Sequence, residues 1–223
     1  MIIDGKKEAA VLREEIKNEI ISIKKKTNKV PGLVVILIGD FAPSQIYVKN
    51  KEKSSKEVGI NSNVLKYSKD VTEEEILKKI KELNNDNNVS GILVQLPLPD
   101  QISKEKIINS IDPSKDVDGF SPINVGKLAS GYNAITPCTP QGCLLLIKKV
   151  EKNLSGKHAV IIGRSNLNGK PIAQLLLKEN CTVTITHSKT KNLKDECLKA
   201  DILIAAVGVA NLVKGDWVKN GSV

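Results

Sequence analysis

Two residues in the segment "YVKNK" have side chains that can exchange protons with a substrate. Tyr47 and Lys51 lie four positions apart, so they share one face of the helix predicted over this segment. A lysine that acts as an acid or base near neutral pH needs its pKa lowered by partial burial or by a neighbouring cation. A tyrosine beside it can orient or relay the proton. Taken singly, both residues have an ordinary explanation, because most helical lysines are solvated and most tyrosines belong to the core.

Two polar residues further along the chain are expected near this pair. Gln95 follows the apolar run "GILV" and should emerge at the carboxyl edge of a sheet, where open α/β sheets bind ligands. Asp118 lies in "KDVDGF", within a long loop. A D-x-D-G sequence is usually a turn, and the other ligands of a calcium loop are absent. We therefore consider Tyr47, Lys51, Gln95 and Asp118 a candidate catalytic cluster that uses no metal ion.

A second group of residues points to a bound nucleotide. The stretch "HAVIIGRSNLNGKPIAQLLL" (158–177) predicts a buried strand, a glycine turn and a helix. The N-terminus of such a helix favours an anion. The next strand ends in "THSKT", without the carboxylate that usually accepts the ribose 2′-OH of NAD. Arg164 and Ser188 suit the 2′-phosphate of NADP instead, beside Gly163 and Ser165.

The spacing of this turn leaves an alternative open. In this alternative interpretation, the domain is an α/β domain that binds no cofactor, and Arg164 is only a surface residue on one of its turns. Turns of similar spacing occur in many α/β proteins, so the NADP interpretation needs further support.

The elements that position these residues alternate between helices and strands. Ser44 is expected to cap the second helix and Gly59 to end it, while Thr72 and Glu75 have capping-box spacing. Asp4 is a plausible cap for the first helix. The helices are predicted over 4–26, 44–59, 72–86 and 103–111, and the strands over 32–40, 61–68 and 89–99. This order predicts a parallel α/β sheet with right-handed crossovers.

The second half of the chain repeats the alternation after a break. Residues 112–142 are rich in Pro, Gly, Ser and Asp and are predicted as a long loop, with a domain boundary near residue 120. A helix is expected from residue 139, strands over 158–163, 181–187 and 201–208, and helices from about Lys170 and Asn192. The fold class is therefore α/β with two domains: 1–120, parallel α/β, and 121–223, Rossmann-like.

Composition excludes several classes of protein. No apolar run approaches the roughly 20 residues of a membrane helix, and no signal peptide is visible, so we expect a cytoplasmic protein without a membrane partner. The four cysteines lack C-x-x-C spacing, which argues against a zinc site and a disulfide framework. The net charge of +9 comes almost entirely from dispersed lysines, and aromatics are only 3% of residues. A nucleic-acid partner is therefore not favoured.

Five motifs occur here in the order typical of one enzyme family: "SQIYVKNK", "GILVQLPLP", "KDVDGF", "PCTPQG" and "GRSNLNGKP". From about residue 2 to its last residue, the chain resembles the methylenetetrahydrofolate dehydrogenase/cyclohydrolase family. The resemblance implies an enzyme of one-carbon metabolism and purine biosynthesis, usually a homodimer, that carries NADP on its second domain. It also implies NADP-dependent oxidation of 5,10-methylenetetrahydrofolate to the 5,10-methenyl compound, followed by hydrolysis to 10-formyltetrahydrofolate.

The resemblance also implies roles for the first cluster. Lys51 resembles the family's catalytic lysine, and Tyr47 is its neighbour on the helix. Gln95 matches the glutamine that hydrogen-bonds the lysine, and Asp118 matches the aspartate that holds the pterin ring.

In the second domain, the resemblance identifies the residues of the turn as a nucleotide site. Gly163, Arg164, Ser165 and Ser188 match the family's cofactor positions. This agrees with the NADP site inferred above from the residues themselves.

The end of the chain carries a further expectation. Gly221, Ser222 and Val223 resemble the first residues of a fourth strand, which in the family continues into a glycine-rich segment and a final helix. We therefore expect residues 1–223 alone to be poorly soluble or oligomeric, with little or no dehydrogenase activity. Two alternatives to the bifunctional folate enzyme stay open. One is a truncated, catalytically impaired remnant that binds folate or NADP, and the other is a basic nucleic-acid-binding module.

Overall fold

The chain forms two compact units, each built on a three-stranded parallel sheet. The computed structural model describes residues 2–223. The first unit contains Asp4–Pro122, and the second contains Ile123–Val223 together with Ile2 and Ile3. The sheet orders are β2-β1-β3 in the first unit and β5-β4-β6 in the second. The α/β class and the parallel sheets agree with the sequence prediction.

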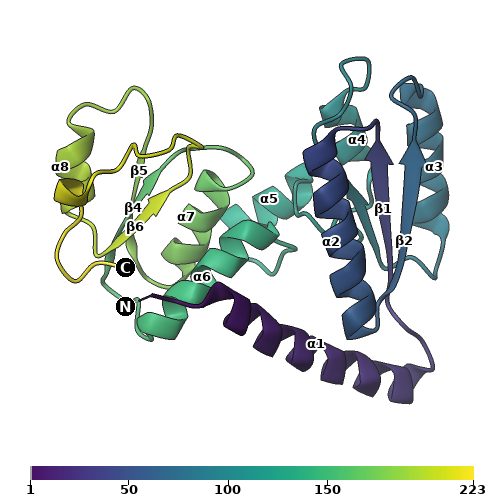
Figure 1. Ribbon diagram of the computed structural model, residues 1–223, viewed down its shortest axis with the longest axis horizontal. Coiled ribbons are helices and arrows are strands. Elements are labelled where there is room, and N and C mark those ends of the chain that lie inside the picture. The colour runs from purple at the N-terminus through teal and green to yellow at the C-terminus, as the bar shows by residue number, and fades with distance from the viewer. Residues whose placement is uncertain (1) are drawn as a thin grey trace. The chain divides into compact units, whose positions relative to one another are not determined.

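The first unit follows the predicted alternation of helices and strands (Figure 1). Its elements are α1 (Gly5–Thr27), β1 (Gly32–Ile38), α2 (Ala42–Val58), β2 (Asn61–Tyr67), α3 (Glu73–Asn85), β3 (Gly91–Val94) and α4 (Lys104–Ser110). The Asp4 carboxylate accepts the N–H groups of Lys6 and Lys7 and caps α1, and Thr72 accepts the N–H of Glu75 at 3.2 Å and caps α3. Both predicted caps are confirmed.

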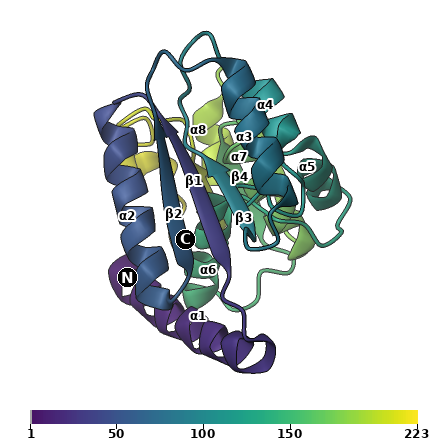
Figure 2. The same ribbon diagram turned by 90° about the vertical axis from the view of Figure 1, so that its right-hand side faces the viewer.

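The central strand β1 is buried on both faces, which explains its unbroken apolar sequence. Val34, Ile36 and Ile38 pack in one core with residues of α3 and α4, while Val35 and Leu37 pack in another with α2. Figure 2 shows α2 on one side of the sheet and α3 with α4 on the other. Each fully buried aliphatic side chain contributes about 1.5–3 kcal/mol. The sheet is therefore a rigid base for the residues at its carboxyl edge.

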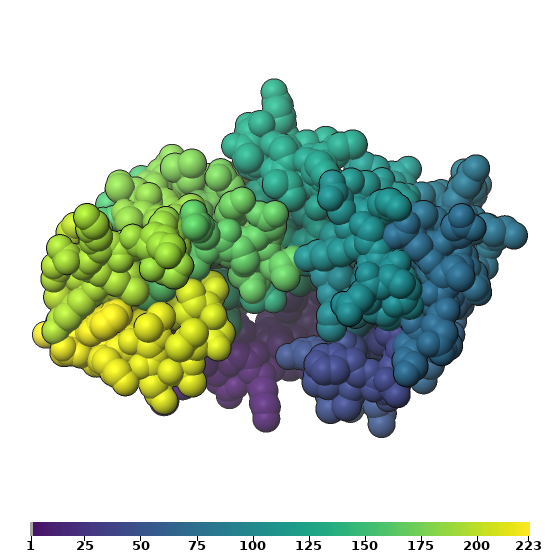
Figure 3. Space-filling model, turned by 90° about the horizontal axis from the view of Figure 1, so that it is seen from above, coloured from purple at the N-terminus to yellow at the C-terminus, as the bar shows by residue number. Residues whose placement is uncertain are grey.

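The second unit repeats this plan around β4. Its elements are α5 (Pro122–Ala129), α6 (Cys138–Val150), β4 (His158–Ile162), α7 (Gly169–Lys178), β5 (Thr182–Thr186), α8 (Leu193–Leu198), β6 (Ile202–Ala205) and the 3₁₀ helix η1 (Gly215–Trp217). Ala159 and Ile161 of β4 pack in one core with residues of α6 and α7. The η1 segment packs beside α8 on the surface (Figure 3). Val223 bonds through its backbone to Asp201 and Leu203 next to β6.

Two sequence predictions about these elements are wrong. Ser44 does not cap α2, because the helix begins at Ala42, with Phe41 as its N-cap residue. Pro43 lies in the first turn, where its fixed φ and missing N–H are tolerated. The predicted loop 112–142 contains α5, whose Gly126 lowers helix propensity and hides the pattern in the sequence. The end of α2 at Gly59 is confirmed, with φ +91°.

Candidate functional site

Lys51 and Gln95 meet at the carboxyl edge of the first sheet, as their positions in the sequence predict. The Lys51 Nζ donates to the Gln95 Oε1 at 3.2 Å. Gln95 follows β3, and its backbone N–H donates to the carbonyl of Ile36 in β1 at 2.9 Å. The Gln95 Nε2 donates to the Leu96 carbonyl at 2.8 Å. Since the amide nitrogen is held by that carbonyl, the amide oxygen is directed to the lysine.

A contact that sequence reasoning missed fixes α2 to this edge. The Ser44 hydroxyl donates to the Leu96 carbonyl at 3.3 Å, and Ser44 is buried. The same carbonyl thus holds both the helix that carries Lys51 and the amide of Gln95. The available signal was the spacing of Ser44 and Val48, a small polar and an apolar residue four positions apart on one buried helix face.

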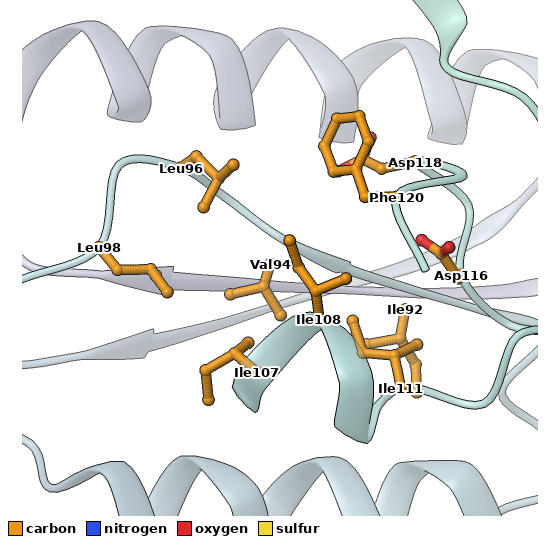
Figure 4. Close-up of a pocket in the computed structure, with 10 residues that line it drawn as sticks. All are labelled: Ile92, Val94, Leu96, Leu98, Ile107, Ile108, Ile111, Asp116, Asp118 and Phe120. Carbon is orange, nitrogen blue, oxygen red and sulfur yellow. The ribbon is translucent and has the colours of Figure 1, made fainter. Parts of the chain in front are cut away.

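Asp118 is one of the residues that line a small hollow beside this edge (Figure 4). Aliphatic side chains of β3, α4 and the residues after them form most of the lining, with Asp116, Asp118 and Phe120 from the following loop. Lys51 is close enough for its charge to act on Asp118. Tyr47 is 63% exposed on α2, one helical turn before Lys51. Its ring is therefore accessible for contact with a flat ligand.

The carboxyl group of Asp118 is in an environment that disfavours its charge. Burial raises the pKa of Asp118, the Lys51 cation opposes that change, and the nearby Asp116 carboxylate adds to it. A carboxyl group whose pKa is raised in the folded state stabilises the fold when protonated. That contribution is lost as the pH rises through the folded-state pKa. Ionised Asp118 therefore lowers stability at neutral pH.

We expect Asp118→Asn to melt at a higher temperature than wild type at pH 7, because the neutral amide removes a desolvated charge. The matched control is Asp112→Asn. Hydrogen bonds from the Ser114 hydroxyl and N–H lower the pKa of Asp112, so its charged form stabilises the fold, and this variant should melt lower. Thermal melting of both variants at pH 7 checks the prediction. A lower melting temperature for Asp118→Asn as well would contradict it.

The second unit contains the predicted glycine turn between β4 and α7. Gly163 has φ +121°, and a Cβ there would lie 2.5 Å from the Ala206 carbonyl oxygen. A Cβ on Gly169 would lie 2.1 Å from the Gly163 carbonyl oxygen. Both positions therefore require glycine. The close approach places the start of α7 beside the turn, where the N–H groups of Gly169 and Lys170 donate to Ser165.

Arg164 and Ser188 lie at corresponding positions of two paired strands. Ile162 of β4 pairs with Thr186 of β5, and the Gly163 N–H donates to the Thr186 carbonyl at 2.8 Å. Arg164 and Ser188 each follow this pair by two residues, at the same edge, and both are exposed. Within residues 2–223, no carboxylate forms an ion pair with Arg164. This arrangement fits the cation and donor that a ribose 2′-phosphate needs.

Side chains within the two turns hold them in shape. The Ser165 Oγ accepts the N–H of Asn168 at 3.1 Å, so Ser165 braces the turn before α7. The Thr190 Oγ1 accepts the N–H of His187 at 2.8 Å and closes the turn that carries Ser188. Sequence reasoning missed Thr190. Its signal was a hydroxyl side chain four residues after the end of β5, since hydroxyl side chains often bond to the backbone of turns.

Among residues 2–223, no three His, Cys, Asp or Glu side chains are grouped as metal ligands. None of the helices in this part of the chain has the length and apolar character needed to cross a bilayer.

Comparison with known proteins identifies the family. Residues 3–118 match the model of the tetrahydrofolate dehydrogenase/cyclohydrolase catalytic domain, and residues 137–223 match the model of the same family's NAD(P)-binding domain. The chain belongs to the tetrahydrofolate dehydrogenase/cyclohydrolase family. A curated relative, the bifunctional protein FolD of Pelagibacter ubique, is 65% identical over 223 residues, which are all of this chain and 79% of the relative.

Two solved structures of the tetrahydrofolate dehydrogenase/cyclohydrolase family have the same fold. The bifunctional FolD enzyme of Campylobacter jejuni matches with a TM-score of 0.97 and 47% identity, covering 100% of this chain and 79% of that one. The Trypanosoma brucei enzyme, solved with NADP and an inhibitor, matches with a TM-score of 0.94 and 33% identity, covering 100% and 76%. These matches confirm the family that the motifs predict and the α/β fold that the alternation of helices and strands predicts.

Proposed function

We propose that this protein oxidises 5,10-methylenetetrahydrofolate with NADP⁺ and hydrolyses the resulting 5,10-methenyltetrahydrofolate to 10-formyltetrahydrofolate. The hydrogen bond from Lys51 to Gln95 at the sheet edge, in a chain of this family, is the observation that carries the proposal. The relatives named above are bifunctional enzymes, and this favours the two-activity enzyme over a remnant that only binds folate or NADP.

For the hydrolysis, we assign the proton transfers to Lys51. The methenyl carbon is a cationic electrophile, and water attacks it to form a new C–O bond. Lys51 in its amine form takes the proton that the water loses. As the bond from N5 to this carbon breaks, protonated Lys51 gives its proton to N5. The hydroxyl oxygen loses its proton to solvent and becomes the carbonyl oxygen of the formyl group, which stays on N10. Gln95 fixes the lysine for this step, since its amide oxygen is held 3.2 Å from the Nζ.

For substrate binding, we assign the pterin ring to Asp118. An ionised carboxylate accepts hydrogen bonds from the ring N–H groups, and charge-assisted bonds of this type are short and strong. The exposed ring of Tyr47 provides a flat apolar surface on the same helix as Lys51. The first assignment rests on the place of Asp118 in the lining of the hollow, and the second on the place of Tyr47 one helical turn before Lys51.

For the oxidation, we assign NADP to the turn formed by Gly163, Arg164, Ser165 and Ser188. The two glycines allow the tight backbone packing that shapes this turn, since a Cβ on either would meet backbone. Arg164 and Ser188 would bind the 2′-phosphate and so select NADP over NAD. When bound, the cofactor supplies the acceptor for the hydride.

We further propose a cytoplasmic homodimer that acts in one-carbon metabolism and supplies purine biosynthesis, with 1–120 as the folate domain and 121–223 as the cofactor domain. The family models, which match residues 3–118 and 137–223, support this division of roles. Light scattering of the purified full-length protein tests the dimer. A single species with the mass of one chain would reject it.

Two separate assays of the full-length protein test the function. The first measures reduction of NADP⁺ or NAD⁺ with 5,10-methylenetetrahydrofolate, and we expect a strong preference for NADP⁺. The second supplies methenyltetrahydrofolate without any cofactor and measures its enzymatic loss above the spontaneous rate. Hydride transfer without hydrolysis would leave a monofunctional dehydrogenase, and the absence of both activities would leave a binding protein.

A further inference from the structure

Asp116 is a charged residue in an unusual position. It is 2% exposed, and it is the only charged residue among the buried side chains of residues 2–223. Burying a carboxylate is unfavourable unless hydrogen bonds replace its water. The sequence around Asp116 predicts an ordinary solvated turn. The burial of its carboxylate is therefore explained by the backbone groups that it binds.

The Asp116 side chain closes the loop that carries Asp118. Its Oδ2 accepts the backbone N–H of Ser121 at 2.7 Å. Its carbonyl accepts the N–H of Gly119 at 3.1 Å, and Gly119 has φ +65°. The chain therefore leaves Asp116, turns at Gly119 and returns to the Asp116 carboxylate at Ser121. Asp118 lies inside this closed segment.

The base of the same loop is fixed to β3, the strand that precedes Gln95. The Ile92 N–H of β3 donates to the Lys115 carbonyl at 2.7 Å, and Asp116 lies opposite Ile92 in a parallel bridge. The Lys115 Nζ donates to three carbonyls at the end of α3, those of Leu83, Asn84 and Asp86, at 2.7–3.0 Å. The loop thus has the same rigid support as Gln95.

We propose that Asp116 is a positioning residue for the folate reactions: by binding the Ser121 N–H, it holds the 116–121 loop closed and keeps the Asp118 carboxylate in place beside Lys51. The inference rests on the proposed role of Asp118 in holding the pterin ring. Figure 4 shows Asp116 and Asp118 coming from the same loop at the edge of the hollow. The two charges that act on Asp118 are the Lys51 cation and the Asp116 carboxylate, and the latter raises the pKa of Asp118.

A double-mutant cycle in the full-length protein tests this inference. Asp116→Ala should raise the KM for folate substrates about tenfold to a hundredfold, because a small misplacement of a binding group has effects of this size. NADP affinity should not change. Asp118→Asn should raise the same KM, and the double variant should be no worse than Asp118→Asn alone, because Asp116 acts through Asp118.

Two further variants distinguish the effect of loop closure from the effect of losing the negative charge and from a nonspecific loss of structure. Asp116→Asn keeps an oxygen that can accept the Ser121 N–H, so it should restore a nearly normal KM. Asp112→Ala is the matched control, an exposed acid in the same segment that holds the N–H of Ser114, and its KM should be normal. If Asp116→Ala does not fold, Asp116→Glu replaces it, since the longer side chain shifts the acceptor and should also raise the KM.

The outcomes distinguish this inference from the proposed function. The positioning role of Asp116 would be overturned if the increases in folate KM were additive in the double variant, or if Asp116→Asn raised the KM as much as Asp116→Ala. The proposed role of Asp118 in binding the pterin ring would remain in either case. A normal folate KM in Asp118→Asn would overturn both the role of Asp118 and the inference built on it.

Discussion

Replacing Lys51 with methionine in the full-length protein is expected to remove methenyl hydrolysis and to leave NADP affinity nearly normal. Methionine keeps much of the length of the lysine side chain but cannot transfer a proton. General acid–base catalysis contributes about 10²- to 10⁴-fold to a rate, so a loss of this size is expected in kcat for the hydrolysis. The cofactor residues all lie in the second unit, and Lys51 lies in the first. Cofactor affinity is therefore not expected to change.

The matched control for this variant is Lys53→Met. Lys53 lies on the same helix, two residues further on, and is exposed. The control loses the same charge without touching Gln95, so its hydrolysis rate should stay close to wild type. Hydrolysis is followed as the loss of methenyltetrahydrofolate, and NADP affinity by fluorescence titration. Wild-type hydrolysis in Lys51→Met would show that another group moves the proton.

The second large effect concerns the choice of cofactor. Arg164→Ala should weaken NADP binding by about 1.5–3 kcal/mol, which is about 10- to 150-fold in affinity, because it removes a charge-assisted pair with the 2′-phosphate. NAD has no 2′-phosphate, so its weaker binding should hardly change. The measurement is a pair of titrations, one for each cofactor, on wild type and variant.

Lys178→Ala controls for the loss of one positive charge. Lys178 is exposed at the last residue of α7, at the opposite end of that helix from the glycine turn. Both cofactors should bind this variant as they bind wild type. Equal losses of NADP and NAD affinity in Arg164→Ala would mean that the guanidinium does not recognise the phosphate.

The fold was largely predictable because its signals are local. The apolar runs of β1 and β4 are buried on both faces, and the caps at Asp4 and Thr72 depend on neighbours within three residues. The meeting of Lys51 and Gln95 followed from one rule, that parallel strands and their connecting helices bring their functional ends to one edge. The start of α2 and the whole of α5 were missed because Pro43 and Gly126 obscure the helical pattern.

The support around the site was not predictable, because it depends on contacts between distant residues. Ser44 bonds to a carbonyl 52 positions away, and the neighbours of Lys115 are about 30 positions away. Asp116 has the sequence environment of a solvated turn, and only the folded chain shows that it is buried. Local patterns therefore identified the residues proposed to react, whereas the residues that hold them became visible only in the structure.

The central claim is that one protein carries out both folate reactions in succession. The most direct test is a single time course of the full-length protein with 5,10-methylenetetrahydrofolate and NADP⁺, in which NADPH, methenyltetrahydrofolate and 10-formyltetrahydrofolate are quantified together. We predict that 10-formyltetrahydrofolate appears in step with NADPH, faster than spontaneous hydrolysis allows, and that this second step fails in Lys51→Met. The claim would be contradicted by NADPH formation with methenyltetrahydrofolate accumulating to the same extent in wild type and variant.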